Sequence, residues 1–218
     1  NKGTGRIGYR LIAVVADLGR GRTYLPANDH QTEIIEQATP GWYPEERLST
    51  HPQYMGAPRY GMARFGDLFT PRQLTTMVTL SDLVKEIRED VCVDARKSGL
   101  SDSEAEEYAR TVTTFLALAL DRCADFNCSL STWKPSGQQQ MHLFTRQAIP
   151  TVWDFTEANL LGEKAICWHN AVELTADALE CIPAGRHDSG TANQIDASGA
   201  WNDTRGLLVS TDPPYYDN

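Results

Sequence analysis

The residues whose types and spacing point most clearly to chemistry lie near the carboxyl end, where Asp212-Pro213-Pro214-Tyr215 follows the apolar run 206–211. That run has the length of a strand and no polar alternation, which is typical of a strand buried on both faces of a parallel sheet. Ligand sites of open α/β sheets lie just beyond the carboxyl ends of such strands. The two prolines fix φ and remove two N–H donors, so the Asp212 carboxylate and the Pro213 carbonyl face outward as acceptors.

Two adjacent acceptors suit an exocyclic amine of a nucleic-acid base. The lone pair of such an amine is delocalised into the ring, and holding both of its hydrogens favours a pyramidal, nucleophilic nitrogen. Tyr215 would stack on the base, which must leave a duplex to be reached. The alternative is purely structural: a strand that ends in a Pro-Pro turn beside an unrelated aromatic residue.

Asp212-Pro213-Pro214-Tyr215 resembles the catalytic motif of the amino-methyltransferases, which use S-adenosylmethionine to methylate adenine N6 or cytosine N4. More of the chain resembles one branch, the large adenine-specific DNA methylases that carry a zinc-ribbon insertion. The resembling segments cover most of residues 65–218 and are Phe65–Leu74, Asp121–Asn127, Arg146–Pro150, Val152–Asn159 and Thr211–Asn218.

The resemblance implies S-adenosyl-L-methionine as cofactor, DNA as partner, adenine N6 as the expected target, and a role in restriction–modification or phage defence. It also suggests cofactor-binding residues. Asp196 ends the strand expected before the catalytic one, and its alternative role is a turn or helix cap. Glu157 and Asn159 are expected at the cofactor or base pocket, with bracing of a loop as the alternative; Leu160-Leu161 stands where the family has Pro-Phe.

Two parts of the family pattern are absent from this sequence: the glycine-rich cofactor loop of the type Asp-Pro-Phe-x-Gly-Gly-Gly and the zinc ribbon. We therefore expect a fragment of a longer polypeptide whose remainder supplies that loop, and we expect the isolated chain to be inactive. Two alternatives stay open. One is the same chemistry on RNA or on a protein glutamine, and the other is a non-catalytic DNA- or protein-binding module.

The charge balance weakens the case for a nucleic-acid-binding surface over the whole chain, because 29 acidic residues against 20 basic ones give a net charge of −9. Residues 1–25 are locally basic, which fits either a solvated hairpin face or phosphate contacts. No apolar stretch approaches the roughly 20 residues of a membrane span, and no leader is evident. The sequence therefore predicts a soluble, cytoplasmic protein without membrane contact.

The cysteines and histidines do not predict a metal site. The five cysteines form no CxxC pair and the five histidines no HxxxH pair, so the spacing typical of zinc ligands is missing. An odd number of cysteines in a chain without a leader favours reduced thiols, most of them buried in the core.

The elements that must position these residues follow from local patterns. A β-hairpin is expected from residues 7–16 and 22–25, and five prolines predict an irregular stretch over 26–64. Capping boxes at Thr70 and Ser101 begin two long helices joined near residues 97–99, and a third helix is expected over 166–182. Three tryptophans are expected in the core: Trp133, Trp153 and Trp168.

These elements predict an α/β fold in which a helical subdomain joins part of a doubly wound, Rossmann-like sheet of the S-adenosylmethionine-dependent methyltransferase type. The expected divisions are residues 1–64 for the hairpin and irregular segment, 65–140 for the helical subdomain, and 141–218 for the partial methyltransferase domain.

Overall fold

The computed structural model describes residues 8–17, 19, 21–145, 148–164, 166–182 and 210. The chain divides into two compact units, residues 1–182 and residues 183–218, and all described residues except Ser210 belong to the first. The strand predicted before the catalytic one, near Asp196, and the catalytic motif lie outside the described residues, as does the run 206–211 apart from Ser210. The architecture given below is that of the first unit.

The predicted amino-terminal hairpin is confirmed. Strands β1 (Ala13–Asp17) and β2 (Arg22–Pro26) pair antiparallel, with Ala13 opposite Pro26 and Asp17 opposite Arg22. The Asp17 carboxylate accepts a hydrogen bond from the Gly19 N–H at 2.9 Å. Gly19 has φ 79°, a left-handed conformation that glycine adopts without steric cost. Asp17 therefore supplies the hydrogen-bond acceptor of the turn, and Gly19 supplies its backbone conformation.

The stretch predicted to be irregular contains a helix, α1 (Asp29–Gln37). Asn28 caps it, since its side chain accepts from the Gln31 N–H at 2.8 Å while the Gln31 side chain accepts from the Asn28 N–H at 3.1 Å. The helix fits between Pro26 and Pro40, so the prolines bound this element rather than abolish it. None of its residues is buried, and only Ile34 and Ile35 are apolar, so the sequence offers no extended apolar stripe of the kind by which helices are usually found.

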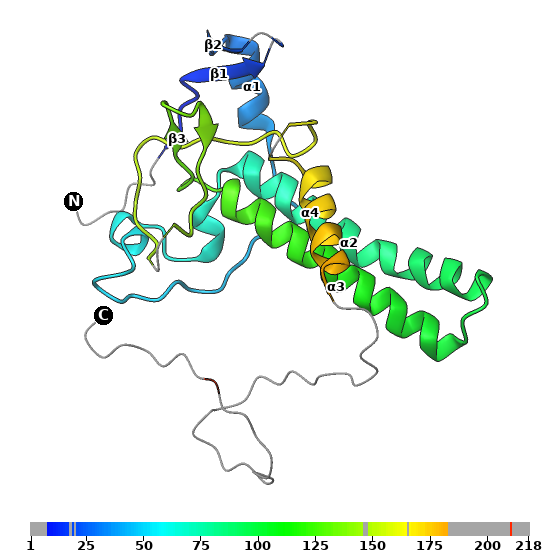
Figure 1. The fold of residues 1–218 in the computed structure, drawn as a ribbon. Helices are drawn as coiled ribbons and strands as arrows, with labels where there is room; N and C mark the ends of the chain where they lie inside the picture. The colour runs from blue at the N-terminus through cyan, green and yellow to red at the C-terminus, as the bar shows by residue number, and fades with distance from the viewer. Residues whose placement is uncertain are drawn as a thin grey trace. The chain divides into compact units, whose positions relative to one another are not determined.

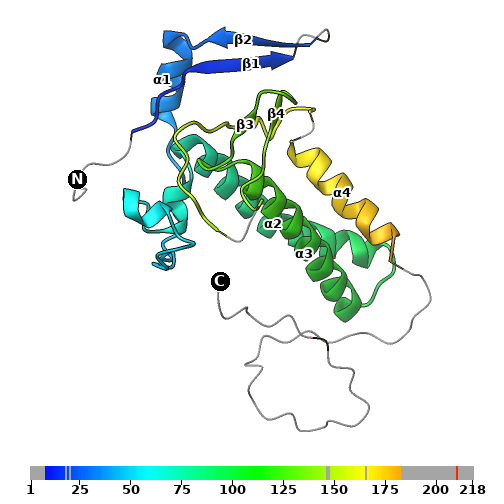
Figure 2. The same ribbon diagram turned by 60° about the vertical axis from the view of Figure 1, so that its left-hand side comes forward.

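Two long helices, α2 (Pro71–Lys97) and α3 (Asp102–Phe126), lie side by side as an antiparallel pair (Figures 1 and 2). Both predicted capping boxes are present: Thr70 with Gln73 begins α2, and Ser101 with Glu104 begins α3. Gly99, with φ 100°, occupies the turn between them. The helical hairpin predicted from the sequence is thus confirmed.

Helix α4 (Trp168–Glu180) packs beside α3 (Figure 2) and confirms the third predicted helix within a few residues. A buried apolar cluster joins it to the helical hairpin. Its members come from α2, α3, α4 and the loop before α4, and they are Met77, Leu80, Ala119, Cys123, Leu160 and Ala171. Because Leu160 is only 2% exposed, this cluster fixes the loop that carries residues 157–160 against the helices.

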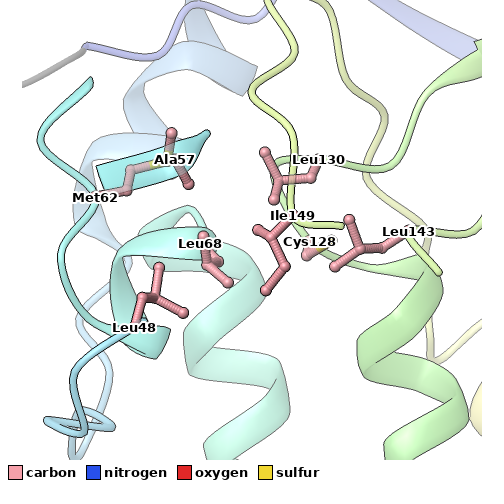
Figure 3. Packing of buried hydrophobic residues seen from close by; sticks show 8 residues of the cluster. All are labelled: Leu48, Ala57, Met62, Leu68, Cys128, Leu130, Leu143 and Ile149. Carbon is pink, nitrogen blue, oxygen red and sulfur yellow. The ribbon is translucent and has the colours of Figure 1, made fainter. Parts of the chain in front are cut away.

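A second apolar cluster packs the segments before α2 against those after α3. Figure 3 shows its side chains from two parts of the chain facing one another: Leu48, Ala57, Met62, Leu68, Cys128, Leu130, Leu143 and Ile149. Two short 3₁₀ helices, η1 (Ala57–Tyr60) and η2 (Phe65–Leu68), lie on one side of it. A small antiparallel pair, β3 (Trp133–Lys134) and β4 (Gln139–Gln140), follows α3.

The first unit therefore combines helices with two small antiparallel sheets. The predicted parallel sheet concerns residues outside the described part of the chain. One core assignment was wrong: Trp153 is 71% exposed and meets Tyr60 edge-on, with ring centroids 5.4 Å apart. Within the residues that the model describes, every helix is too short or too polar to traverse a bilayer.

Candidate functional site

The structure describes two of the predicted site residues, Glu157 and Asn159, whereas Asp196 and the motif residues lie outside the described part of the chain. The described residues still define a site, because Glu157 lies at the amino end of α2 and contacts residues more than eighty positions earlier in the sequence. At this end of α2, polar groups from segments distant in sequence converge on a cavity.

The capping box of α2 orients the first polar groups of the site. Gln73 donates its backbone N–H to the Thr70 hydroxyl at 3.2 Å, and the Gln73 side-chain oxygen accepts from the Thr70 N–H at 2.9 Å. Pro71 follows at the first helical position, where a missing N–H costs nothing. Local sequence therefore fixes the directions of the Thr70 and Gln73 side chains at the start of the helix.

Glu157 is held by three hydrogen bonds from this helix end. The Thr70 hydroxyl donates to Oε1 at 2.9 Å, and Arg72 donates to Oε2 from Nε at 3.0 Å and from Nη2 at 2.5 Å. The side chains of Arg72 and Glu157 are 29% and 22% exposed, so the ion pair is partly shielded from water. Arginine favours this two-donor geometry on a carboxylate because its guanidinium is planar and rigid.

A cavity of about 180 Å³ opens beside this ion pair. Its lining residues come from α2, from the carboxyl end of α3 and from the loop before α4, and they are Arg72, Gln73, Thr76, Asn127, Glu157 and Ala158. Asn127, which is 2% exposed, accepts from the Ala158 N–H at 3.0 Å through its side-chain oxygen. The cavity wall is therefore tied together by hydrogen bonds between segments that are distant in sequence.

Among the residues of the cavity wall, Gln73 has a buried side-chain nitrogen without a hydrogen-bond partner in the described part of the chain. The residue is 2% exposed, and the nitrogen is its Nε2. A buried amide that lacks a partner is uncommon in folded proteins and calls for an explanation at each occurrence. Here the unpaired donor belongs to a residue that lines a cavity.

Asn159 does not line the cavity. It is exposed, its side-chain oxygen accepts from the Leu161 N–H at 3.2 Å, and its carbonyl accepts from the Gly162 N–H at 3.0 Å. These bonds form a tight turn that directs Leu160 into the core and leaves Leu161 79% exposed. The structure thus gives Asn159 a loop-bracing contact and places Glu157 at the cavity.

An acidic residue with two tyrosines shapes the segment that leads into α2. Asp67 accepts from the Tyr43 hydroxyl and, through its other oxygen, from the Ala63 and Arg64 N–H groups at 2.8 and 2.9 Å. Burial raises the pKa of Tyr43, and the hydrogen bond to Asp67 raises it further. Burial also raises the pKa of Tyr9. A hydrogen bond with Ser129 lowers this pKa, and the negative charges of Asp67 and Glu157 raise it. Both phenols therefore stay protonated at neutral pH.

Two of the buried cysteines, Cys123 and Cys128, are not activated as nucleophiles. All five cysteines are unpaired, and four of them are buried, as the sequence predicts. Burial raises the pKa of Cys123 to about 11, with a further contribution from Cys167 and a small opposing one from Arg122. Burial also raises the pKa of Cys128. Reactive thiols require a lowered pKa, so these two side chains serve packing.

No group of three or more His, Cys, Asp or Glu side chains suited to hold a metal ion occurs in the described part of the chain. Sequence reasoning missed Arg72, Gln73 and Asn127 as members of the site. A signal for them was present, since they lie in two of the segments that carry the family resemblance, 65–74 and 121–127, and Glu157 lies in a third, 152–159. The three segments meet at this cavity.

Comparisons with known proteins found no matching family model, no matching curated protein and no matching solved structure.

Proposed function

We propose that this chain is part of a DNA methyltransferase that transfers a methyl group from S-adenosyl-L-methionine to an exocyclic base amine, with adenine N6 as the expected target. The observation that carries the proposal is the sequence Asp212-Pro213-Pro214-Tyr215 directly after the apolar run 206–211. That combination delivers a carboxylate, a carbonyl and an aromatic ring to one strand end, where α/β folds bind their ligands.

In the proposed reaction, the Asp212 carboxylate and the Pro213 carbonyl accept the two hydrogens of the amine. This pair of bonds turns the nitrogen lone pair out of conjugation with the ring and toward the methyl group. Pro213 and Pro214 keep the acceptors rigid because their φ angles are fixed. Tyr215 stacks on the base after it leaves the duplex. The cofactor, when bound, would supply the electrophilic methyl group: the S–C bond breaks as the N–C bond forms, S-adenosylhomocysteine leaves, and the amine loses one of its two hydrogens as a proton.

The described residues fit a polar cofactor. The cavity beside α2 is lined by a guanidinium and a carboxylate, on Arg72 and Glu157. Both charge signs are therefore available beside a space of about 180 Å³. In this proposal these side chains contact the cofactor, and a glycine-rich loop from another part of a longer polypeptide completes the site.

The proposal is tested by methylation of duplex DNA with labelled S-adenosylmethionine, using the complete protein that contains this chain. Wild type is compared with Asp212→Ala and with a control, Asp177→Ala, which alters an exposed carboxylate on α4. We expect labelled N6-methyladenine with wild type and the control, and none with Asp212→Ala.

Other outcomes would replace the proposal. Label in RNA or in a protein glutamine would show the same chemistry on another substrate. Absence of both methylation and cofactor binding in the complete protein would leave a non-catalytic DNA- or protein-binding module. In the proposed role, a cytoplasmic enzyme of restriction–modification or phage defence, methylation would depend on the DNA sequence.

A further inference from the structure

Two aromatic rings form an exposed pair where η1 lies beside residues 148–153. Trp153 is 71% exposed and Tyr60 is 45% exposed, and the two rings meet edge to face with their centroids 5.4 Å apart. Most of the indole surface is therefore in contact with solvent. Since large aromatic side chains usually bury this surface, the exposed pair indicates a place where a partner binds.

The backbone beneath this pair is held in place by contacts between the two segments. Ile149 donates its N–H to the Tyr54 carbonyl at 2.8 Å, and Gly56 donates its N–H to the Ile149 carbonyl at 2.9 Å. A Cβ on Gly56 would lie 3.2 Å from the Thr151 nitrogen, so the two segments approach closely. Ala57 and Ile149 belong to the same buried apolar cluster (Figure 3). The aromatic pair thus projects from a fixed part of the structure.

The segment that carries the exposed tyrosine is positively charged, although the chain as a whole has a net charge of −9. Residues 47–66 contain no Asp or Glu, and they contain three arginines: Arg47, Arg59 and Arg64. Arg64 forms an ion pair with Glu45 at 3.5 Å, whereas Arg47 and Arg59 form none with the residues that the structure describes. Two cationic side chains of this segment are therefore available to an anionic partner.

Arg59 is the cation next to the aromatic pair along the chain. It directly precedes Tyr60 in η1 and is exposed. Its guanidinium donates to the Pro52 carbonyl, which leaves further N–H groups to donate to a ligand. Asp154, which follows Trp153, is the acidic residue nearest to the pair in sequence. The two arginines without ion pairs outnumber this carboxylate, so the charge beside the rings favours an anion.

Exposed aromatic rings beside cations match a ligand that carries flat rings along an anionic backbone, because bases stack on aromatic side chains and arginine binds phosphate. We propose that Trp153, Tyr60 and Arg59 form a surface that binds unpaired nucleotides of DNA, with a base stacked on the indole and a phosphate at the guanidinium. DNA satisfies these contacts, since none of them uses a 2′-hydroxyl. Bases inside a duplex are already stacked on both faces, so the surface favours a single strand. The inference uses no residue of the proposed methyl-transfer motif.

The test measures binding of this chain to a labelled oligothymidylate by fluorescence anisotropy, with the single strand compared with its duplex with oligoadenylate. We expect tighter binding of the single strand. Trp153→Leu should weaken single-strand binding about tenfold, the loss expected for one stacked base. Trp153→Phe keeps an aromatic face and should retain most of the affinity. Because Trp153 is largely exposed, both variants should fold, which circular dichroism checks.

Matched variants separate stacking and phosphate contacts from unspecific effects. Tyr60→Leu should weaken single-strand binding, whereas Tyr108→Leu should not, because Tyr108 is an exposed tyrosine among acidic residues of α3. Arg59→Gln should make the affinity less dependent on salt, because the loss of a phosphate contact releases fewer counterions. Arg110→Gln removes an exposed arginine that pairs with Glu107 and should leave the salt dependence unchanged.

Several outcomes would overturn the inference. One is absence of oligothymidylate binding, including a case in which polyglutamate or anionic vesicles bind instead. Equal affinity for single strand and duplex, or affinity unchanged by Trp153→Leu, would show that only phosphates are contacted. Tighter binding of oligouridylate would assign the surface to RNA. The proposed function is tested separately: methylation by the complete protein without oligothymidylate binding by this chain would overturn this inference alone, and the reverse result would overturn the proposed function alone.

Discussion

Replacing Glu157 with glutamine should destabilise the chain by about 2 kcal/mol. The substitution keeps the shape of the side chain, removes its charge and turns one of its two acceptor oxygens into an NH2 donor. Glu157 accepts three hydrogen bonds, two of them from that cation, and both partners are less than one third exposed. Exposed ion pairs contribute roughly 0–1 kcal/mol and breaking fully buried ones costs about 3–5 kcal/mol, so a partly buried pair lies between.

The loss should be specific to this ion pair. Arg88 and Glu106 form a second ion pair between α2 and α3, with side chains 45% and 55% exposed. The same Glu→Gln change at Glu106 should therefore cost roughly 0–1 kcal/mol. Urea unfolding followed by far-ultraviolet circular dichroism gives both values from the shift in midpoint at constant slope.

A double-mutant cycle completes the measurement. Combining Arg72→Gln with Glu157→Gln should cost less than the sum of the single changes, because the second substitution removes a partner already lost. A cost for Glu157→Gln within about 0.5 kcal/mol of that for Glu106→Gln would refute the reasoning, since shielding from water would then contribute nothing. Additive single changes would refute it as well.

Three further outcomes follow from the same contacts. Thr70→Ala should cost about 1–2 kcal/mol in urea unfolding, because it removes both the cap of α2 and a donor to the carboxylate beside it. Gly66→Ala should cost about 1–3 kcal/mol and less in a Tyr43→Ala background, because a Cβ would lie 2.6 Å from the tyrosine ring. In the folded chain at pH 8, a disulfide reagent should modify exposed Cys181 well before buried Cys123. The pKa of Cys123 is raised from 9.0 to about 11, so the stability from its neutral thiol is complete below pH 9.0 and declines as pH rises through about 11.

Matched substitutions control these experiments. Ser101→Ala removes the cap of α3 and an exposed hydrogen bond to the Glu104 carboxylate, whereas the corresponding bond of Thr70 is partly buried, so it should cost about 1 kcal/mol, less than Thr70→Ala. Gly41→Ala places a Cβ where no atom lies within 4 Å and should leave stability nearly unchanged. If Thr70→Ala cost no more stability than Ser101→Ala, the contribution of the Thr70–Glu157 hydrogen bond would be contradicted. If Gly66→Ala cost no more than Gly41→Ala, the close approach of Gly66 to the Tyr43 ring would be contradicted. Labelling of Cys123 at the rate of Cys181 would contradict the burial of its thiol.

Local sequence patterns predicted the elements well where neighbouring residues decide the structure. Thr70 with Gln73 and Ser101 with Glu104 mark helix starts because each capping box is complete within four residues. The same pattern at Asn28 and Gln31 begins α1, which was missed because the surrounding prolines suggested an irregular stretch and the helix has no buried face.

Burial and the composition of the site depended on contacts between distant residues. Trp153 is an aromatic residue of the kind usually found in cores, yet it is 71% exposed, since burial depends on which segments pack over a residue. Glu157 was predicted at a functional pocket, but its partners Thr70 and Arg72 lie 87 and 85 residues away. No periodicity or spacing within a local window could pair them.

The sequence by itself thus determined the helical hairpin, the amino-terminal β-hairpin, the buried thiols and the motif Asp212–Tyr215 that carries the proposed chemistry. These depend on short-range hydrogen bonds, apolar periodicity and residue type. Tertiary structure alone decided that the start of α2, the end of α3 and the loop at Glu157 line one open cavity. The physical reason is that an ion pair and a cavity wall form only when packing of the apolar clusters brings remote segments within hydrogen-bonding distance.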